Sequence, residues 1–372
     1  MINLTTKIKE MTVESGKRIL VTSDIHGNLQ YFKNVLTKAS FSDNDILFIV
    51  GDIIEKGSEN LKTLRYVMEL CKKGNVIPLI GNVDAYRIKL IYGLSEENVN
   101  GFYNYILSLR EWAGTSFYEE LANECGYSIN SPDDILASKQ DVIAHFESEF
   151  NFIASLPTIV KTQNYDFVHG GLREKKVEDN INKGVLELTK FDAFMSQTPH
   201  TYDKYVIVGH WPVVLYSNSV QQMNPIFDRE KNIISIDGGC GVKKEGQLNL
   251  LIIPDINCSV NDITYISYDD ITTVTALESQ NNSNNSVYIS WLNREIRILD
   301  KGDEFSYIEH IQSGRKFDIP NCYIRNENEC FDYTDYLLSV NSGDKLSLIT
   351  KTSKGCIVKK DGVIGWYLGK YV

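Results

Sequence analysis

No hydrophobic run in this sequence is long enough to cross a membrane. The chain has 372 residues, and none of its apolar stretches approaches the ~20 consecutive residues that a membrane-spanning helix requires. Residues 1–17 are also too polar for the hydrophobic core of a signal peptide. We therefore expect a cytoplasmic protein with no membrane partner.

Cysteine is scattered along the chain and is not found in pairs. The seven cysteines are an odd number, and none of them belongs to a Cys-x-x-Cys motif. This distribution argues against a disulfide framework and against a zinc site built from cysteine alone.

Positive charge is also in short supply. The chain has 38 Lys and Arg residues against 49 Asp and Glu residues, which gives a formal net charge of −11. Binding to nucleic acid or to an anionic membrane relies on clustered basic residues, so we expect neither partner. If the substrate is an anion, a bound metal ion is the simplest way to reverse the sign of the local field.

The apolar residues that are present follow an α/β pattern from Arg18 to about Pro254. Short runs rich in Ile and Val predict buried strands: RILVTS, DILFIV, NVIPLI, YDFVHG, KYVIVG, NIISID and LNLLII. Amphipathic segments between them, such as NLKTLRYVMELCKK, predict helices. Residues 85–156 contain no convincing strand. We interpret them as a helical insertion in a layered α/β domain that covers residues 1–272.

The remainder of the chain has a different composition. Residues 273–285 include the polar run ESQNNSNNS and are predicted to form a linker. From residue 286 to residue 372, runs such as REIRIL, KLSLIT and GVIGWYL alternate apolar with polar residues, and turn sequences such as Asp-Gly separate them. This pattern predicts a small all-β barrel.

The residues that can carry chemistry follow the predicted strands of the first domain. Six side chains with oxygen or nitrogen donors lie there: Asp24, His26, Asp52, Asn82, His169 and His210. A single Asp in such a position is usually a helix N-cap, and a single His is more often a core or surface residue than a ligand. Six together at one edge of a sheet, where open α/β folds build their sites, are better explained as a binding site.

The donor types indicate which ions such a site would bind. Carboxylate, imidazole and amide donors without a thiolate suit Mn, Fe or Zn. Six donors exceed the three or four that a single catalytic ion takes from the protein. Two divalent ions that share one carboxylate would use all six, and two-metal sites clamp the oxygens of an in-line displacement at phosphorus. We therefore predict a dinuclear centre for phosphoester chemistry.

The ordered motifs resemble those of calcineurin-like metallophosphoesterases, especially the serine/threonine protein phosphatase branch. They are Asp24-x-His26-Gly27, Gly51-Asp52, Gly81-Asn82, His169-Gly170-Gly171, Gly209-His210 and the IDGG sequence at 236–239. The similarity spans roughly residues 18–250 and implies a four-layer αββα sandwich. It also implies two sets of metal ligands: Asp24, His26 and Asp52 for the first ion, and Asp52, Asn82, His169 and His210 for the second, with Asp52 shared.

The sequence departs from this branch at two motifs. The branch's Gly-Asp-x-x-Asp-Arg-Gly is here GDIIEKG, so that Glu55 stands for Asp and Lys56 for Arg. Lys56 attracts a phosphate as a point charge, without the planar fork of Arg. The branch's Gly-Asn-His-Glu contains a His that protonates the leaving group, and Val83 replaces that His here. General-acid help is typically worth ~10²–10⁴ in rate and matters most for a poor leaving group.

Two interpretations of Val83 remain open. In the first, the enzyme favours phosphoanhydrides or aryl phosphates, or it uses another acid, for which the candidates are Asp84, Glu55 and His200. In the second, Val83 packs under the loop and a metal-bound water supplies the proton. Two arginines, Arg87 and Arg173, are further candidates to contact a substrate phosphate, with surface solvation as the alternative role for each.

The C-terminal segment is similar in texture to bacterial SH3-like domains, most clearly at KKDGVIGWYLGKYV. Trp366, Tyr367 and Tyr371 would then form an aromatic groove for a peptide or protein partner. The alternative is that Trp366 fills the core of a small barrel, which needs one large aromatic residue.

Together these features predict a metal-dependent phosphatase that hydrolyses phosphomonoesters, on a phosphoprotein or a small phosphoester, by attack of a metal-bridging hydroxide. The two ions and Lys56 would stabilise the transferring charge. A nucleotide or dinucleoside polyphosphate hydrolase is the alternative enzyme, and the absent His would suit it. A non-catalytic scaffold acting through the β barrel is the third alternative, although the six intact donors argue against it.

Overall fold

Buried apolar strands build two sheets in the first part of the chain. The computed structural model describes residues 4–372, which cluster into two units. The first unit consists of two segments, one that reaches Pro212 and one from Pro225 to Asp269. The second unit comprises Val213–Asn224 and Asp270–Val372. The second unit thus includes residues 213–224 in addition to the C-terminal part of the chain.

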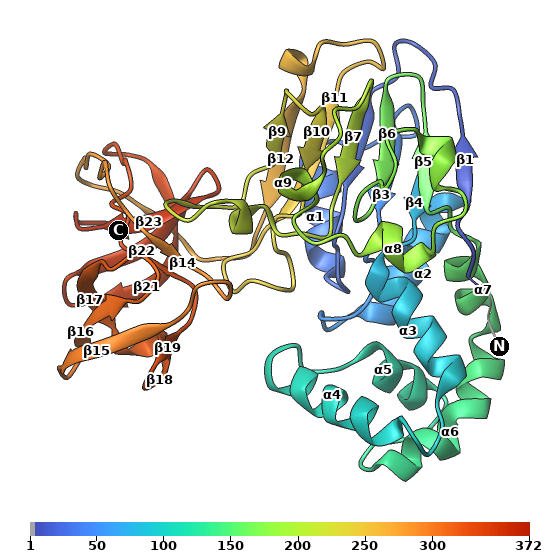
Figure 1. Ribbon diagram of the computed structural model, residues 1–372, viewed down its shortest axis with the longest axis horizontal. Coiled ribbons are helices and arrows are strands. Elements are labelled where there is room, and N and C mark those ends of the chain that lie inside the picture. Colours follow the sequence, from blue (N-terminus) through green and yellow to red (C-terminus); the bar gives the residue numbers. More distant parts are fainter. Residues whose placement is uncertain (1–3) are drawn as a thin grey trace. The chain divides into compact units, whose positions relative to one another are not determined.

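The first unit contains two mixed sheets (Figure 1). The β3 sheet has the order β12 (Thr264–Tyr268), β11 (Leu248–Ile253), β2 (Ile19–Thr22), β3 (Ile46–Val50) and β4 (Val76–Leu79). The β7 sheet has the order β1 (Ile8–Glu10), β5 (Ile159–Lys161), β6 (Tyr165–Val168), β7 (Tyr205–Val208), β10 (Ile233–Ser235) and β9 (Ile226–Asp228). Pro78 lies in β4, where its missing N–H is tolerated because β4 is an edge strand.

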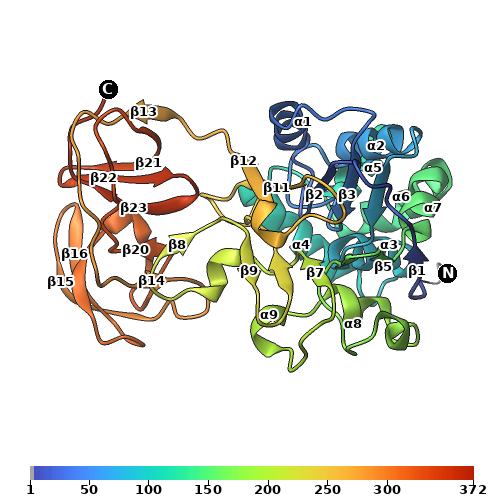
Figure 2. The same ribbon diagram turned by 90° about the horizontal axis from the view of Figure 1, so that it is seen from above.

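The two sheets pack face to face. Their shared core contains side chains from both, and the rings of Phe48 in β3 and Phe167 in β6 stack with centroids 4.0 Å apart. The other face of the β3 sheet is covered by α1 (Leu29–Lys38), α2 (Asn60–Cys71) and the insertion helices. The short helices α8 (Val185–Thr189) and α9 (Phe194–Gln197) lie on the side of the β7 sheet (Figure 2). The mixed α/β layering is thus confirmed.

The insertion between β4 and β5 is helical, as predicted. Its helices are α3 (Asn82–Gly93), α4 (Val99–Trp112), α5 (Phe117–Glu124), α6 (Pro132–His145) and α7 (Glu147–Ser155). Local capping explains where two of them begin. Ser116 and Glu119 form a capping box at α5, while the Ser131 hydroxyl caps α6 and Pro132 occupies its first turn.

The second unit is all-β, as expected. Its main sheet has the order β13 (Thr273–Thr275), β21 (Lys345–Thr352), β22 (Gly355–Lys360), β23 (Val363–Tyr367) and β8 (Gln221–Gln222). A second sheet pairs β15 (Ile296–Lys301), β16 (Phe305–His310) and β17 (Lys316–Pro320). Two-strand pairs join β14 (Tyr288–Ile289) to β20 (Tyr333–Thr334) and β18 (Ile324–Asn326) to β19 (Glu329–Cys330).

The prediction of a linker at residues 273–285 is wrong. Residues 273–275 form β13 and pair with β21, and Gln280 exchanges backbone hydrogen bonds with Val340. The Gln280 amide also donates to the carbonyls of Leu338 and Trp366, at 2.8 and 2.7 Å. Most residues of this segment are exposed, but these hydrogen bonds tie it to the sheet, so it is not a free linker.

The aromatic residues expected to form a groove are largely internal. Trp366 is buried, and its indole N–H donates to Tyr333 Oη and to the Thr334 carbonyl, both at 3.1 Å. Tyr367 is also buried, with its hydroxyl 2.7 Å from the Glu278 carbonyl. The groove interpretation is therefore wrong for these two residues, and the core role of Trp366 is confirmed.

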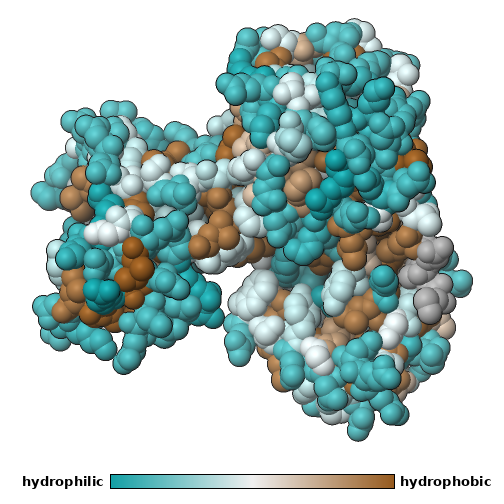
Figure 3. All heavy atoms as spheres, in the orientation of Figure 1, coloured by the Kyte–Doolittle hydropathy of each residue, from teal (hydrophilic) through white to brown (hydrophobic). Residues whose placement is uncertain are grey.

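On the face drawn in Figure 3, apolar residues (brown) are interspersed with hydrophilic ones. In the second unit, Ile298, Leu299 and Ile311 line an open groove of about 600 Å³ beside the edge strand β15. Within the part of the chain that the structure describes, no helix is both long enough and apolar enough to cross a membrane.

Candidate metal centre

The strand ends of both sheets deliver the six predicted donors. In the β3 sheet, the parallel neighbours are β2, β3 and β4: β2 is followed by Asp24 and His26, β3 by Asp52 and β4 by Asn82. In the β7 sheet, the parallel neighbours β6 and β7 are followed by His169 and His210. Because parallel strands end at the same edge, these loops meet, and the sequence-based interpretation of the strand ends matches this topology.

The loops at this edge hold side chains in a sparsely populated backbone conformation. Six donor or neighbouring residues have a positive φ: Asp24 (56°), His26 (49°), Asp52 (52°), Glu55 (73°), Lys56 (68°) and His210 (65°). Such residues cost of order 1–3 kcal/mol each unless the surroundings impose the conformation, and they cluster at functional sites. The concentration of these residues here is an independent structural sign of function.

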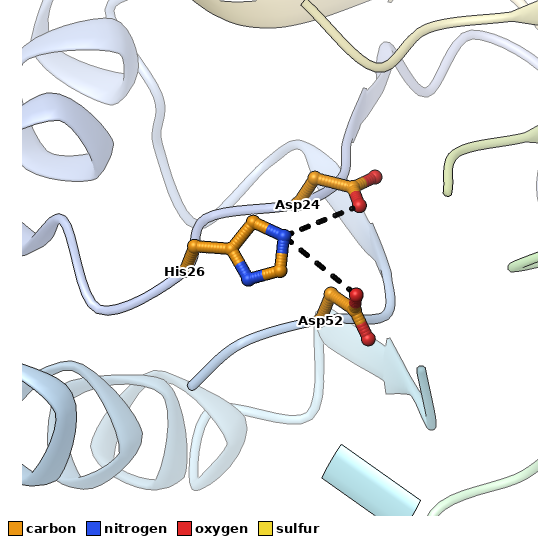
Figure 4. A group of neighbouring side chains, drawn as sticks. All are labelled: Asp24, His26 and Asp52. Atoms are coloured by element: carbon orange, nitrogen blue, oxygen red, sulfur yellow. Dashed lines mark ion pairs between the residues drawn. The ribbon is translucent and has the colours of Figure 1, made fainter. Parts of the chain in front are cut away.

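The first group of donors consists of two carboxylates and an imidazole, all buried. His26 Nε2 lies 3.7 Å from Asp24 Oδ1 and 3.6 Å from Asp52 Oδ2 (Figure 4). His26 Nδ1 faces the Ile54 carbonyl at 3.3 Å, which leaves the Nε2 edge turned toward the carboxylates. Figure 4 shows the ring pointing between the two acids.

The second group is built around His169. Its Nδ1 donates to the Val50 carbonyl at 2.7 Å, and its Nε2 lies 3.0 Å from Asn82 Oδ1 and 3.4 Å from Asp52 Oδ1. The backbone N–H of Val83 donates to the same Asp52 oxygen at 2.8 Å. Val83 therefore contributes through its main chain, at the N-terminus of α3, where a helix favours a negative charge.

His210 approaches from β7. Its backbone N–H donates to Asp24 Oδ2 at 3.0 Å, and its ring centroid is 5.4 Å from that of His169. Its Nε2 donates to Asp192 Oδ1 at 2.8 Å. His210 thus joins the same cluster through both its main chain and its ring.

Glycine at two positions allows this close approach. A Cβ added to Gly81 would lie 2.1 Å from both the backbone nitrogen and Oδ1 of Asp52. A Cβ added to Gly209 would lie 1.8 Å from Ser23 Oγ and 2.4 Å from Asp24 Oδ2. Any side chain at either position would therefore displace a candidate ligand.

Burial and mutual charge shift the pKa values of the cluster in opposite directions. Burial raises the pKa of Asp24 to about 6 and lowers the pKa of His26 to about 3. Burial would also raise the pKa of Asp52, but the charge of His169 holds it well below its usual range. Against the effect of burial, Asp52 and Asp24 raise the pKa of His169 to about 10. Positive charge is therefore favoured on His169, which faces the carboxylates, and disfavoured on the buried ring of His26.

The donor set fits divalent cations. The pKa of His26 leaves its Nε2 as a lone pair that faces two carboxylates, and these three groups offer ligand atoms within 4.8 Å of one another. At His169, Nε2 faces Oδ1 of both Asp52 and Asn82, so a cation placed among them would meet three donors. Oxygen and nitrogen donors without sulfur suit Mn, Fe or Zn.

Two carboxylates proposed as proton donors are engaged elsewhere. Asp84 is fully buried and accepts from the backbone N–H groups of Gly81, Ile53 and Ile54, at 2.9, 3.0 and 3.2 Å. Glu55 is also fully buried, and its Oε2 lies 3.3 Å from Arg87 Nε. Both assignments are corrected: these carboxylates hold the loop after β3 in place.

The two arginines predicted to bind a substrate phosphate are also engaged in contacts within the protein. Arg87 is buried, pairs with Glu55 and lies over the Tyr105 ring at 4.5 Å from its centroid. Arg173 donates from Nε to the Glu187 carbonyl at 2.8 Å and stacks on Phe191. The phosphate role of Arg87 is therefore wrong, because its guanidinium is enclosed by the insertion, and the described contacts of Arg173 are structural.

The other two candidates differ in their relation to the cluster. Lys56 is half-buried, and its Nζ lies 3.3 Å from His26 Nε2, so its charge reaches the donors. His200 contacts the ring of Tyr202, and its backbone bonds to the Thr198 hydroxyl, neither of which is a candidate ligand. Of the two, only Lys56 has a described contact with a candidate ligand.

Three residues of the site were not predicted. Asp192 bonds to His210, and the Ser23 hydroxyl donates to Asp24. Burial, and after it the charge of Asp24, raise the pKa of Asp237 well above its usual value. Asp237 lies in the IDGG motif and Ser23 directly precedes Asp24, so both had a signal nearby. Asp192 follows no strand and no glycine, and its role is visible only in three dimensions.

A family model establishes where this geometry belongs. The model described as calcineurin-like phosphoesterase matches residues 17–234, more than half of the chain. This chain belongs to the calcineurin-like phosphoesterase family. The matched range of this calcineurin-like phosphoesterase includes all six candidate donors, and the resemblance stated from the motifs is confirmed at the level of the family.

Relatives of this calcineurin-like phosphoesterase share shorter segments with it. A symmetrical bis(5'-nucleosyl)-tetraphosphatase from Buchnera aphidicola subsp. Schizaphis graminum is 35% identical over 94 residues, which are 25% of this chain and 34% of that protein. A protein of the same name from Colwellia psychrerythraea is 26% identical over 118 residues, 30% of this chain and 41% of its own. The chain thus matches between a third and two fifths of the length of these relatives.

Matches among solved structures include a serine/threonine phosphatase from Saccharomyces cerevisiae. It is 11% identical, and the match covers 72% of this chain and 85% of that one with a TM-score of 0.43. A chain provisionally described as a diadenosine tetraphosphatase is 19% identical, with coverages of 71% and 99% and a TM-score of 0.42.

Proposed function

We propose that this protein is a metal-dependent phosphoester hydrolase with two divalent ions, Mn, Fe or Zn, at the shared edge of the two sheets. The observation that supports it most is the convergence of six oxygen and nitrogen donors, with the lone pair of His26 turned toward Asp24 and Asp52. Asp52 is the proposed shared ligand, because its two oxygens face His26 and His169 separately.

Residues of the chain would orient the metal ligands and add positive charge in such a reaction. When two ions are bound, they supply positive charge and an activated water for an in-line displacement at phosphorus. The Val83 N–H orients the Asp52 carboxylate, and the backbone carbonyls of Ile54 and Val50 fix the rings of His26 and His169. Lys56 adds a positive charge beside His26, where it attracts a substrate phosphate.

The absence of a proton-donating side chain at position 83 favours one class of substrate over another. Val83 cannot donate a proton, and the carboxyls of Glu55 and Asp84 are buried in other contacts. The loss of general-acid help costs least when the leaving group is stable as an anion, as in a phosphoanhydride. This favours a nucleotide or dinucleoside polyphosphate over a phosphoserine-type monoester, and the partial similarity to two symmetrical bis(5'-nucleosyl)-tetraphosphatases supports the same choice.

The substrate test compares three compounds under one condition. Purified protein loaded with Mn is given p-nitrophenyl phosphate, a phosphoserine peptide and a symmetrical dinucleoside tetraphosphate. Water added to the middle of the tetraphosphate yields two nucleoside diphosphates, which chromatography detects. We expect kcat/KM to be highest for the tetraphosphate and lowest for the phosphoserine peptide.

The outcomes of this test separate the candidate functions. Equal kcat/KM values on the phosphoserine peptide and p-nitrophenyl phosphate would remove the leaving-group argument and favour the protein phosphatase-like alternative. Failure to retain metal or to cleave any of the three would favour the non-catalytic scaffold. For Asp→Asn substitutions within the cluster, Asp43→Asn serves as the matched control, because Asp43 is an exposed partner of Lys73 outside the cluster.

We also propose that the second unit is a separate binding module of SH3-like type. Its candidate surface is the groove beside β15, an edge strand of its sheet, because an extended peptide can add a strand at a sheet edge. Titration of a peptide library against the protein, with Ile298→Lys as the comparison variant, tests this role. Equal binding by the variant would exclude the groove.

A further inference from the structure

Each histidine of the candidate centre has one ring nitrogen held by an acceptor outside the donor cluster. For His26 and His169 the acceptor is a backbone carbonyl, of Ile54 and Val50 respectively, and the held nitrogen is Nδ1. For His210 the held nitrogen is Nε2, and the acceptor is the carboxylate of Asp192. A partner of this kind fixes the tautomer and the ring orientation of a metal-binding histidine.

The loop that carries Asp192 is fastened on both sides. Arg173, four residues after His169, donates from Nε to the Glu187 carbonyl at 2.8 Å, and its guanidinium carbon lies 3.7 Å from the centroid of the Phe191 ring. On the other side, Phe194 is buried, and its ring fills the space beside Gly171. Asp192 is therefore held between two anchored aromatic residues, although its side chain is half exposed.

We propose that Asp192 is a positioning residue for His210, which it holds with the proton on Nε2 and with Nδ1 turned toward the second ion. This inference rests on the proposed function, since it needs an ion for His210 to bind. The carboxylate also increases the basicity of the ring, which strengthens a bond from Nδ1 to a cation. His26 and His169 would by contrast bind through Nε2.

The first experiment measures metal binding to the apoprotein. Titration calorimetry with Mn on the wild type is expected to show two ions. Asp192→Ala should weaken the second ion by about 10–100-fold and leave the first unchanged, while Asp192→Asn, whose amide oxygen still accepts, should lose less. Asp203→Asn is the control, because Asp203 is an exposed partner of Lys175 and should behave as wild type.

A double-mutant cycle with His210→Ala tests whether Asp192 affects metal binding through His210 or through a general change of structure. If Asp192 acts through His210, the variant Asp192→Ala/His210→Ala should bind Mn no more weakly than His210→Ala alone. Additive losses would overturn the proposal, as would wild-type binding by Asp192→Ala. A wild type that binds no ion would instead contradict the proposed function. Circular dichroism verifies folding, and Asp192→Asn carries the test if the alanine variant does not fold.

The ring nitrogens can also be observed directly. The chain has six histidines, so [¹⁵N]His labelling of the Zn-loaded protein gives a spectrum that His210→Ala assigns. We expect the His210 signals to report a protonated Nε2 and a ligated Nδ1. A ligated Nε2 in the wild type would exclude the proposed orientation.

Discussion

The two halves of the candidate centre are held in different ways. The first half, Asp24, His26 and Asp52, comes from consecutive strand ends of one sheet, and all three side chains are buried. The second half collects Asn82, His169 and His210 from three loops of both sheets. Its outermost histidine depends on a half-exposed carboxylate, not on a backbone carbonyl. The first half therefore depends on the pairing of two neighbouring strands, whereas the second half depends on how the two sheets meet.

The loss of the residue shared by both halves should have the largest effect. Asp52→Asn keeps the shape of the side chain but removes the charge that faces His26 and His169. We expect kcat/KM on p-nitrophenyl phosphate to fall well beyond the ~10–100-fold that loss of an outer-shell partner typically costs. Bound metal, measured by elemental analysis, should fall in the same variant. Retention of both ions with full activity would contradict the role of Asp52.

The next largest effect is expected on stability, from the ion pair that anchors the loop of the first half. Glu55 lies in its loop and pairs with Arg87 of α3 inside the protein. Breaking a buried ion pair from one side typically costs about 3–5 kcal/mol, because the remaining charge stays buried. Glu55→Gln should lose that much of the free energy of unfolding of the first unit, measured by urea denaturation in chelator.

Two comparison variants make this second prediction specific. Glu69→Gln breaks an exposed pair with Lys72 and should cost at most about 1 kcal/mol. Glu55→Gln/Arg87→Met removes both charges and should recover part of the loss. A Glu55→Gln variant as stable as Glu69→Gln would show that the pair does not anchor the loop.

The donors were predictable from sequence because each follows a strand in a local motif. The alternation of apolar runs with Gly-Asp, Gly-Asn and Gly-His locates strand ends, and parallel strands bring those ends together. The same reasoning failed for Glu55 and Arg87. Their partners are set by how α3 and α4 pack, and in the sequence Arg87 resembles an ordinary polar residue in the middle of a helix.

Other features had no local signal at all. The strand β8 is the pair Gln221–Gln222, and its partners Val363 and Ile364 lie about 140 residues later. No periodicity exists in two polar residues, so their transfer to the second unit could not be foreseen. Asp192 is a similar case, since only the fold brings it to His210.

Removal of metal should have a smaller effect, which is confined to the thermal stability of the first unit. Each ion at 100 times its dissociation constant stabilises the folded state by about 2.7 kcal/mol, which corresponds to about 5–10 °C per ion for a unit of this size. Calorimetry should show chelation lowering the melting transition of the first unit and leaving that of the second unchanged. In Asp52→Asn the first transition should no longer respond to chelator. A response confined to the second unit would contradict the location of the site.

The smallest effect expected is that of Lys56, which lies beside the first half without being a ligand. Its Nζ is 3.3 Å from His26 Nε2, and the side chain is half-buried. A hydrogen bond to a charged group is worth about 1.5–3 kcal/mol, and partial exposure favours the lower limit, so Lys56→Met should lower kcat/KM about tenfold. Lys56→Arg keeps the charge and should restore most of it, whereas Lys62→Met changes an exposed lysine of α2 and should have no effect. If Lys56→Met matches wild type, the donors and their ions hold the phosphate alone, and the first half needs no side-chain charge beyond its ligands.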